Sequence, residues 1–338
     1  MGYARIKILS TIDLEGWRVG KCVLLTKGYL QNYLEQFQQV APEYEFRYRD
    51  EDMLTEQDLA DVQVIIGSPE PGELKNCRQL EWLHLCQAGS DTYAEQGVLR
   101  PGTLLTNASG AFGASIAEFM VGMTLELCHR LQVYRDYQHT ARWHYAGPVK
   151  LVEGSTALVV GAGDIGCAYA KRMKALGAYT IGVRRANAQQ PAELDELHLI
   201  DQLDQLLPRA DFISLSLPNS AATHHIINET RLGLCKPDAV LINIGRGSAV
   251  DTDALCRALQ QGRLWGFGAD VTEPEPLPAD HPLWRFENVV ITPHMSGMYE
   301  ATQNNDRLAG IATENLRRYA HGESLHKLVD FSTGYRKR

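Results

Sequence analysis

From residue 156 onward, short apolar runs typical of buried strands alternate with segments whose apolar positions recur at helical spacing. The six runs predicted as strands are 157–160, 179–183, 211–217, 239–244, 265–271 and 288–292. Strands and helices that alternate in this way build a doubly wound parallel sheet with helices on its faces. The pattern therefore predicts an α/β fold for this part of the chain.

A shorter alternation of the same kind occupies about residues 20 to 108. Its predicted strands are 21–26, 44–48, 62–67, 83–86 and 104–106, and its predicted helices are 29–40 and 73–81. This pattern indicates a second, smaller α/β domain of flavodoxin-like type. Residues 1–20 fit neither pattern, and we expect an extra strand or an arm there.

Two helical segments connect the two regions. The apolar-rich stretch 111–128 suits burial at a domain interface, and the chain becomes helical again from His294 to Tyr319. We expect the second segment to cross back to the N-terminal region. The predicted division is one domain of residues 1–118 and 303–338 and a second domain of residues 119–302.

A glycine-rich turn joins the first strand of the second domain to a helix, in the order G-x-G-x-x-G. Its first glycine permits a tight turn, its second lets backbone approach phosphates, and its third lets the helix pack closely on the strand. The free N–H groups at the helix start attract a pyrophosphate. The fold is therefore predicted to be of Rossmann type, with a dinucleotide bound in the second domain. The expected contacts in this turn are Gly161, Gly163, Asp164, Ile165 and Gly166.

Composition and charge narrow the classes of partner. The 338 residues, 44% hydrophobic and 22% charged, suit a soluble protein of two ordinary domains. A net charge of −8 disfavours nucleic acid, whose binding requires clustered Lys and Arg. The seven cysteines are scattered and odd in number without a C-x-x-C pair, so we expect reduced thiols in a cytoplasmic protein. No apolar run approaches about 18 residues, and a membrane partner is not expected.

Three ionisable residues follow the last three predicted strands. Arg246 lies in Asn-Ile-Gly-Arg-Gly, Glu275 in Asp-Val-Thr-Glu-Pro-Glu-Pro, and His294 in Thr-Pro-His. Ligands of open α/β sheets bind beyond the carboxyl ends of the strands, so these side chains can converge on the cofactor's crevice. Singly, an arginine after a strand is most often a surface ion-pair partner, a glutamate among prolines is usually solvated, and a histidine is usually structural. Their combination after a dinucleotide loop predicts a catalytic site.

With these motifs, the sequence resembles the D-isomer-specific 2-hydroxyacid dehydrogenases, in particular glyoxylate and hydroxypyruvate reductases, over about residues 62–310. The shared motifs are Asn107 to Gly110 with Ala117-Glu118, Asn243 to Gly247, Asp270 to Pro276, and Thr292 to Gly297. The resemblance implies that Arg246, Glu275 and His294 are catalytic and that Ala88, Gly89 and Ser90, with Arg246, bind the substrate carboxylate. It implies further cofactor contacts by Leu217, Pro218, Thr223, Ile244, Asp270, His294 and Gly297. Asp164 departs from the family's basic residue, and its side chain receives no role.

The residue types suit the reduction of a 2-oxo acid. Arg246 would hold carboxylate and carbonyl through its planar fork. His294 would donate the proton to the developing alkoxide, and Glu275 would fix its tautomer from the other ring nitrogen. The cofactor supplies the hydride. No metal is required, and no ligand cluster is evident in the sequence.

The end of the second strand indicates the cofactor. NAD-binding versions of this fold place a carboxylate about 20 residues after the glycine loop, where it accepts from the ribose 2′-OH. Here Arg184 and Arg185 stand in that place. Two guanidinium groups suit a 2′-phosphate, so we expect NADP to be preferred, with NAD possible.

The leading hypothesis is therefore an NADPH-preferring reductase of small 2-oxo acids. The alternatives are a dinucleotide-sensing binding protein similar to the C-terminal-binding-protein corepressors and a catalytically idle relative. The resemblance also implies a homodimer formed through residues 127–148, which include Arg130, Tyr134, Trp143 and Tyr145. Four residues, Phe112, Trp143, Trp284 and Met298, suit either a substrate pocket or ordinary packing.

Overall fold

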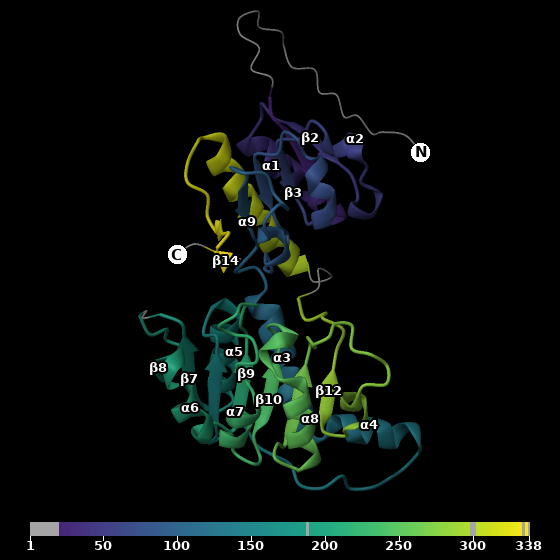
Figure 1. Ribbon diagram of the computed structural model, residues 1–338, viewed down its shortest axis with the longest axis vertical. Coiled ribbons are helices and arrows are strands. Elements are labelled where there is room, and N and C mark those ends of the chain that lie inside the picture. The colour runs from purple at the N-terminus through teal and green to yellow at the C-terminus, as the bar shows by residue number, and fades with distance from the viewer. Residues whose placement is uncertain (1–19, 187–188, 298–301, 333–334, 337–338) are drawn as a thin grey trace, which may run out of the picture.

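Two parallel sheets form separate lobes in the computed structural model, which describes residues 20–186, 189–297, 302–332 and 335–336 (Figure 1). The N-terminal sheet has the order β2-β1-β3-β4-β5. Its strands are β1 (Cys22–Leu25), β2 (Glu45–Tyr48), β3 (Val64–Ile66), β4 (Trp82–His84) and β5 (Leu104–Thr106). All neighbouring strands pair in parallel, as the α/β pattern predicts.

Alternate residues of β1 face opposite sides of this sheet. Val23 and Leu25 pack with α1 (Leu34–Val40) and α9 (Thr302–Ala320), whereas Cys22 and Leu24 pack toward α2 (Glu56–Leu59). This period of two is the side-chain alternation of an extended strand. Both faces of the small sheet are therefore covered.

Two predicted helices of this lobe differ in the structure. The segment 29–40 begins as a 3-10 helix (Gly28–Tyr33) and only then becomes α1. The helix predicted over 73–81 is wrong, because the chain forms a short 3-10 helix (Pro71–Asn76) and then a turn before β4. The remaining 3-10 helices of this lobe are Glu51–Met53 and Thr92–Ala94.

The C-terminal sheet has seven parallel strands in the order β12-β11-β10-β9-β6-β7-β8. They are β6 (Thr156–Val160), β7 (Tyr179–Arg184), β8 (Glu196–Leu199), β9 (Phe212–Leu215), β10 (Val240–Asn243), β11 (Gly266–Ala269) and β12 (Val289–Ile291). The six predicted strands are confirmed. The seventh, β8, lies at one edge of the sheet with every residue only partly buried, and its sequence lacks the apolar run that marks the others.

Helices cover both faces of this sheet. They are α3 (Gly113–His129), α4 (Leu131–His139), α5 (Asp164–Ala175), α6 (Leu203–Leu206), α7 (Glu229–Leu234) and α8 (Thr252–Gln260), with 3-10 helices at Ile200–Gln202, Leu207–Arg209, Gly247–Ala249 and Pro282–Arg285. On one face, α3 and α5 bury Met120, Tyr169 and their neighbours against Val159. On the other, α8 buries Leu255 against Leu241.

The helix α9 returns to the N-terminal lobe, as predicted. It packs beside α1, and the chain after it pairs Leu328 with Thr106 before a small hairpin of β13 (Val329–Asp330) and β14 (Tyr335–Arg336). Figure 1 shows α9 lying across the upper lobe. The predicted boundary between residues 118 and 119 falls inside α3, and the domain division stays a prediction. The arm or strand expected at 1–20 lies almost wholly outside the described residues.

No helix in the described part of the chain is both long and apolar enough to cross a membrane. All seven cysteines are unpaired, and five of them are buried.

Candidate active site

The glycine turn between β6 and α5 has the shape that the sequence predicts. Gly161 has φ +102°, and a Cβ there would lie 2.6 Å from the carbonyl oxygen of Ser216. A Cβ on Gly166 would lie 2.3 Å from the carbonyl oxygen of Gly161, so only glycine lets α5 approach so closely. In contrast, a Cβ on Gly163 would meet no atom within 4 Å. The open side of Gly163, at the start of α5, fits a dinucleotide pyrophosphate.

The loops that follow β9 and β10 lie together beside this turn. A Cβ on Gly245 would lie 2.7 Å from the nitrogen of Leu217, and Ile244 is buried next to it. The hydroxyl of Thr223 donates to the carbonyl of Pro218 (2.6 Å) and closes the turn after β9. Leu217, Pro218, Thr223 and Ile244 are therefore grouped at the carboxyl ends of the strands. Their contacts with a cofactor stay predictions.

The two arginines after β7 differ in their surroundings. The Nε–H of Arg184 donates to the carbonyl oxygen of Ala162, inside the glycine turn, and the guanidinium also lies 3.7 Å from the sulfur of Cys167. Arg185 is exposed. The guanidinium of Arg184 is thus fixed against the glycine turn, and Arg185 faces solvent at the same strand end. This arrangement suits a 2′-phosphate. Asp164 begins α5, and its carboxylate lies against Gly113.

Asp270 holds the loop that carries His294. Its buried carboxylate accepts from the hydroxyl of Thr292 (2.6 Å) and from the backbone N–H groups of Met295 (2.8 Å) and Ser296 (2.9 Å). His294 itself has φ +52°, and its N–H donates to the backbone carbonyl of Asp270. These contacts give Asp270 a positioning role toward the histidine. The predicted contact of Asp270 with the cofactor is a separate expectation that stays a prediction.

The imidazole of His294 and the carboxylate of Glu275 meet at the carboxyl end of the sheet. Nδ1 of His294 donates to Oε1 of Glu275 at 2.6 Å. Both side chains are nearly half exposed. This pairing orients the ring so that Nε2 is the nitrogen left to face a substrate, as a proton donor requires.

Arg246 lies against the loop that follows β4. The family resemblance implies that this loop binds the substrate. A Cβ on Gly89 would lie 2.4 Å from Nη2 of Arg246, so glycine is needed for the guanidinium to lie there. Nη2 and Nε of Arg246 also bind the carboxylate of Asp91 at 2.9 and 3.2 Å. The resemblance places Asp91 at the end of the substrate loop, but the sequence did not reveal the partner of its carboxylate, because Arg246 lies 155 residues away.

Asn107 fixes the shape of the same loop. Its side-chain N–H group donates to the carbonyl of Ala88 (2.8 Å) and to the hydroxyl of Ser90 (3.3 Å), and both Asn107 and Ser90 are buried. The loop Ala88 to Asp91 is therefore held rigidly beside Arg246. The geometry brings together the predicted substrate loop and the predicted catalytic arginine.

Four other predicted positions, one for cofactor binding and three for a substrate pocket, have different outcomes. Gly297 lies near Ile116 and Phe112, with 3.5 Å between Ile116 and the position of an added Cβ, and Phe112 is buried in the core. Met298 lies outside the described residues. The side chain of Trp284 is half exposed and donates to the carbonyl of Pro278.

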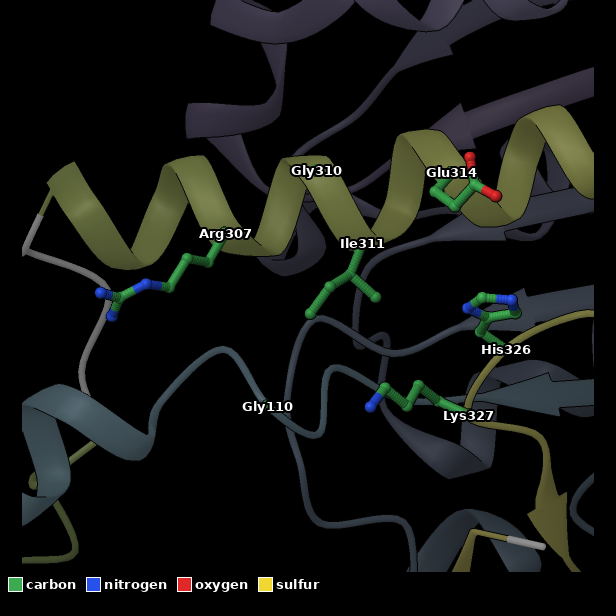
Figure 2. A pocket seen from close by; sticks show the side chains of 7 residues that line it. All are labelled: Gly110, Arg307, Gly310, Ile311, Glu314, His326 and Lys327. Carbon is green, nitrogen blue, oxygen red and sulfur yellow. The ribbon is translucent and has the colours of Figure 1, made fainter. Parts of the chain in front are cut away.

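A cavity of about 330 Å³ lies elsewhere, between α9 and the segment after β5 (Figure 2). Figure 2 shows Ile311 reaching from α9 toward the segment that carries Gly110. Neither Arg246 nor His294 lines this cavity. The candidate active site lies where Arg246, after β10, meets the loop Ala88 to Asp91 of the N-terminal lobe.

The structure also places three side chains with metal-binding donors together. Sequence alone shows no ligand cluster, yet His224, His225 and Glu273 gather their donor atoms within 4.8 Å of one another. Glu273 is distant in sequence from the histidine pair, so no local spacing reveals the group.

Comparison with known proteins identifies the family. Residues 121–296 match the family model for the NAD binding domain of D-isomer specific 2-hydroxyacid dehydrogenases. A glyoxylate reductase of Thermofilum pendens is 36% identical over 241 residues, which cover 68% of each chain. A crystal structure of a D-isomer specific 2-hydroxyacid dehydrogenase family protein from Aeromonas salmonicida has a TM-score of 0.81 at 32% identity, covering 92% of this chain and 99% of the other.

A second solved structure carries a nicotinamide dinucleotide. It is a D-isomer specific 2-hydroxyacid dehydrogenase from Xanthobacter autotrophicus in complex with NADPH and MES. Its TM-score is 0.79 at 26% identity, covering 94% of this chain and 100% of that chain. Together with the glycine turn and the residues beyond the strands, these similarities show that the chain belongs to the D-isomer specific 2-hydroxyacid dehydrogenases and is an NAD(P)-dependent oxidoreductase.

Proposed function

We propose that the protein is an NADPH-preferring reductase of small 2-oxo acids such as glyoxylate or hydroxypyruvate. The observation that carries this proposal is that Arg246 lies against Gly89 and Asp91, and that His294 acts electrostatically on the same Asp91 carboxylate. A 2-oxo acid presents a carboxylate and a neighbouring carbonyl, which match a guanidinium and a proton donor that both lie near Asp91. The glyoxylate reductase relative supports the choice of substrate class.

In the proposed reaction, each residue has a separate task. Arg246 binds the carboxylate and polarises the carbonyl oxygen of the substrate. Nε2 of protonated His294 gives its proton to that oxygen, while Glu275 holds the opposite ring nitrogen. Asp270 keeps the histidine loop in place. When bound, the reduced nicotinamide supplies the hydride to the carbonyl carbon.

The preference for NADPH rests on the end of β7. No carboxylate follows Val183 in the position that would bind a ribose 2′-OH, and Arg184 and Arg185 offer positive charge instead. Arg184 already contacts the glycine turn through Ala162. The NADPH complex of the Xanthobacter relative supports the same choice.

We also propose a homodimer formed through residues 127–148 and a reducing compartment such as the cytoplasm. Trp143 is 104% exposed and Tyr145 is 71% exposed, which is costly for aromatic side chains unless another surface covers them. The unpaired thiols support the compartment.

The test of the proposed function is a panel of 2-oxo acids with NADPH and NADH in parallel. Glyoxylate and hydroxypyruvate should be reduced fastest, and kcat/KM should be higher with NADPH. If the protein binds dinucleotide but turns over no 2-oxo acid, it is a binding protein like the corepressors. If turnover is fast but favours NADH, only the cofactor assignment fails.

A further inference from the structure

His224 and His225 stand beside Glu273 on the surface of the C-terminal lobe. The two imidazole rings are stacked with centroids 3.9 Å apart. Nε2 of His225 lies 3.0 Å from Oε2 of Glu273, and Nε2 of His224 lies 4.0 Å from Oε1. The carboxylate therefore lies against both rings, with one oxygen toward each. None of the three residues has a task in the proposed reaction.

The backbones on both sides of this group are held in place. His225 has φ +46°, a conformation unusual for a residue other than glycine, and its N–H donates to the carbonyl of Ser248 at 2.7 Å. The carbonyl of Glu273 accepts from the hydroxyl of Thr252 at 3.2 Å. Gly247 lies so close to Thr272 that an added Cβ would meet its carbonyl carbon at 2.0 Å. The side chains can adjust while their backbones stay in position.

We propose that His224, His225 and Glu273 form a binding site for a divalent transition-metal ion of the zinc type. Two imidazoles and one carboxylate are a recurring ligand set for zinc, and water completes such sites. With metal–ligand distances of about 2.0–2.1 Å, tetrahedral ligands stand about 3.3 Å apart. The distance of 3.0 Å between Nε2 of His225 and Oε2 of Glu273 is close to this value. The distance of 4.0 Å between Nε2 of His224 and Oε1 of Glu273 requires a small side-chain rotation.

The position of the site joins two functional loops. The histidines end the turn after β9, which contains Pro218 and Thr223, and Glu273 lies two residues before Glu275. A metal ion would therefore tie the turn beside the predicted cofactor site to the loop of the catalytic glutamate. Binding of the metal does not depend on the proposed function, whereas any effect on turnover does.

The test is a calorimetric titration of the full-length, chelator-treated protein with zinc chloride. A second measurement is the metal content of the protein after zinc loading and desalting. One zinc ion should bind per chain. Glu273→Gln keeps the shape of the side chain but loses its charge, and His225→Asn replaces a ligand with a residue that tolerates positive φ. Each variant should weaken zinc binding at least tenfold. In the parent, zinc should also slow hydrogen exchange in residues 272–276.

A matched control comes from another histidine–carboxylate pair. Nε2 of His198 lies 2.6 Å from Oε2 of Glu196. Among the described residues, this pair belongs to no group of three metal-binding side chains. His198→Asn should leave zinc binding unchanged. Melting curves in chelator establish that each variant is folded. The proposal is overturned if the parent binds no zinc, or if Glu273→Gln and His225→Asn bind zinc as the parent does.

Discussion

Arg246 and Asp91 form a two-point ion pair, with Nη2–Oδ1 at 2.9 Å and Nε–Oδ2 at 3.2 Å, that joins the loop after β10 to the loop after β4. Burial alone would raise the pKa of Asp91, but the hydrogen bonds and charge of Arg246 and the charge of His294 lower it below its ordinary value. A carboxylate from the N-terminal lobe thus lies near Arg246 and His294, two residues of the other lobe that we propose to be catalytic. It holds the guanidinium fork in a fixed orientation.

Asp91→Ala should lower kcat/KM for the best 2-oxo acid by about tenfold or more, because a misplaced guanidinium no longer meets the substrate in the required geometry. Asp91→Asn keeps one oxygen acceptor and should fall between the parent and the alanine variant. Steady-state kinetics measure both. Glu118→Gln, which removes the carboxylate of the exposed pair with Arg172, is the control and should change nothing. Unchanged kinetics for Asp91→Ala would contradict a positioning role.

His294→Ala should lower kcat by about 10²–10⁴-fold and change KM little, because the proton is required mainly in the transition state. Arg246→Ala should instead lower kcat and raise KM, since the guanidinium also binds the substrate before reaction. Steady-state kinetics at saturating cofactor separate the two cases. Near-parental turnover in His294→Ala would show that another group donates the proton.

Arg184→Ala should weaken NADPH binding by roughly 10- to 150-fold, because a charge-assisted hydrogen bond to phosphate contributes about 1.5–3 kcal/mol. NADH lacks the 2′-phosphate and should lose little, which makes it the internal control. Arg184→Asp should swing the preference toward NADH by repelling the phosphate and accepting from the 2′-OH. The ratio of kcat/KM for the two cofactors at fixed ionic strength measures the effect. A ratio that does not move rules out this role for Arg184.

His84 makes stability depend on pH. It is buried in β4 with Nδ1 2.7 Å from the hydroxyl of Thr106, and burial lowers its pKa to about 3. In the unfolded chain, His84 is protonated below about pH 6.5, whereas in the folded chain it stays neutral down to about pH 3. The free energy of unfolding therefore falls as pH decreases from about 6.5 toward 3. His84 should contribute up to about 1.4 kcal/mol per pH unit to the free energy of unfolding in that window.

The variant His84→Gln should therefore show a shallower loss of stability with falling pH. Denaturant unfolding at several pH values between about 7 and 4 measures the slope. His139, which is exposed at the end of α4, provides the control, and His139→Gln should keep the parental slope. Equal slopes in His84→Gln and the parent would mean that other groups control the acid response.

The parent should be a dimer at micromolar concentration by light scattering. The substitution Trp143→Glu should raise the dissociation constant of this dimer at least tenfold. A buried charge in an aromatic interface is left without a partner. Trp284→Glu changes a half-exposed tryptophan outside the proposed interface and should remain dimeric. A monomeric parent would exclude the proposed dimer.

The sequence by itself determined the features that depend on neighbouring residues. The glycines at 161 and 166 were predictable because each relieves a clash with nearby backbone. The six predicted strands were visible because each carries a continuous apolar run, which burial on both faces requires of all but the edge strand β12. The order of Arg246, Glu275 and His294 was also visible, because carboxyl ends of parallel strands meet at one edge.

Only the tertiary structure decided the contacts between distant segments. Asp91 meets Arg246 across 155 residues, and Glu273 meets His225 across 48, although no periodicity relates either pair. The edge strand β8 escaped prediction because its four residues contain a glutamate and a histidine and so form no continuous apolar run. Such features arise when whole elements pack together, since a side chain's partner is then chosen by the fold and not by its neighbours in sequence.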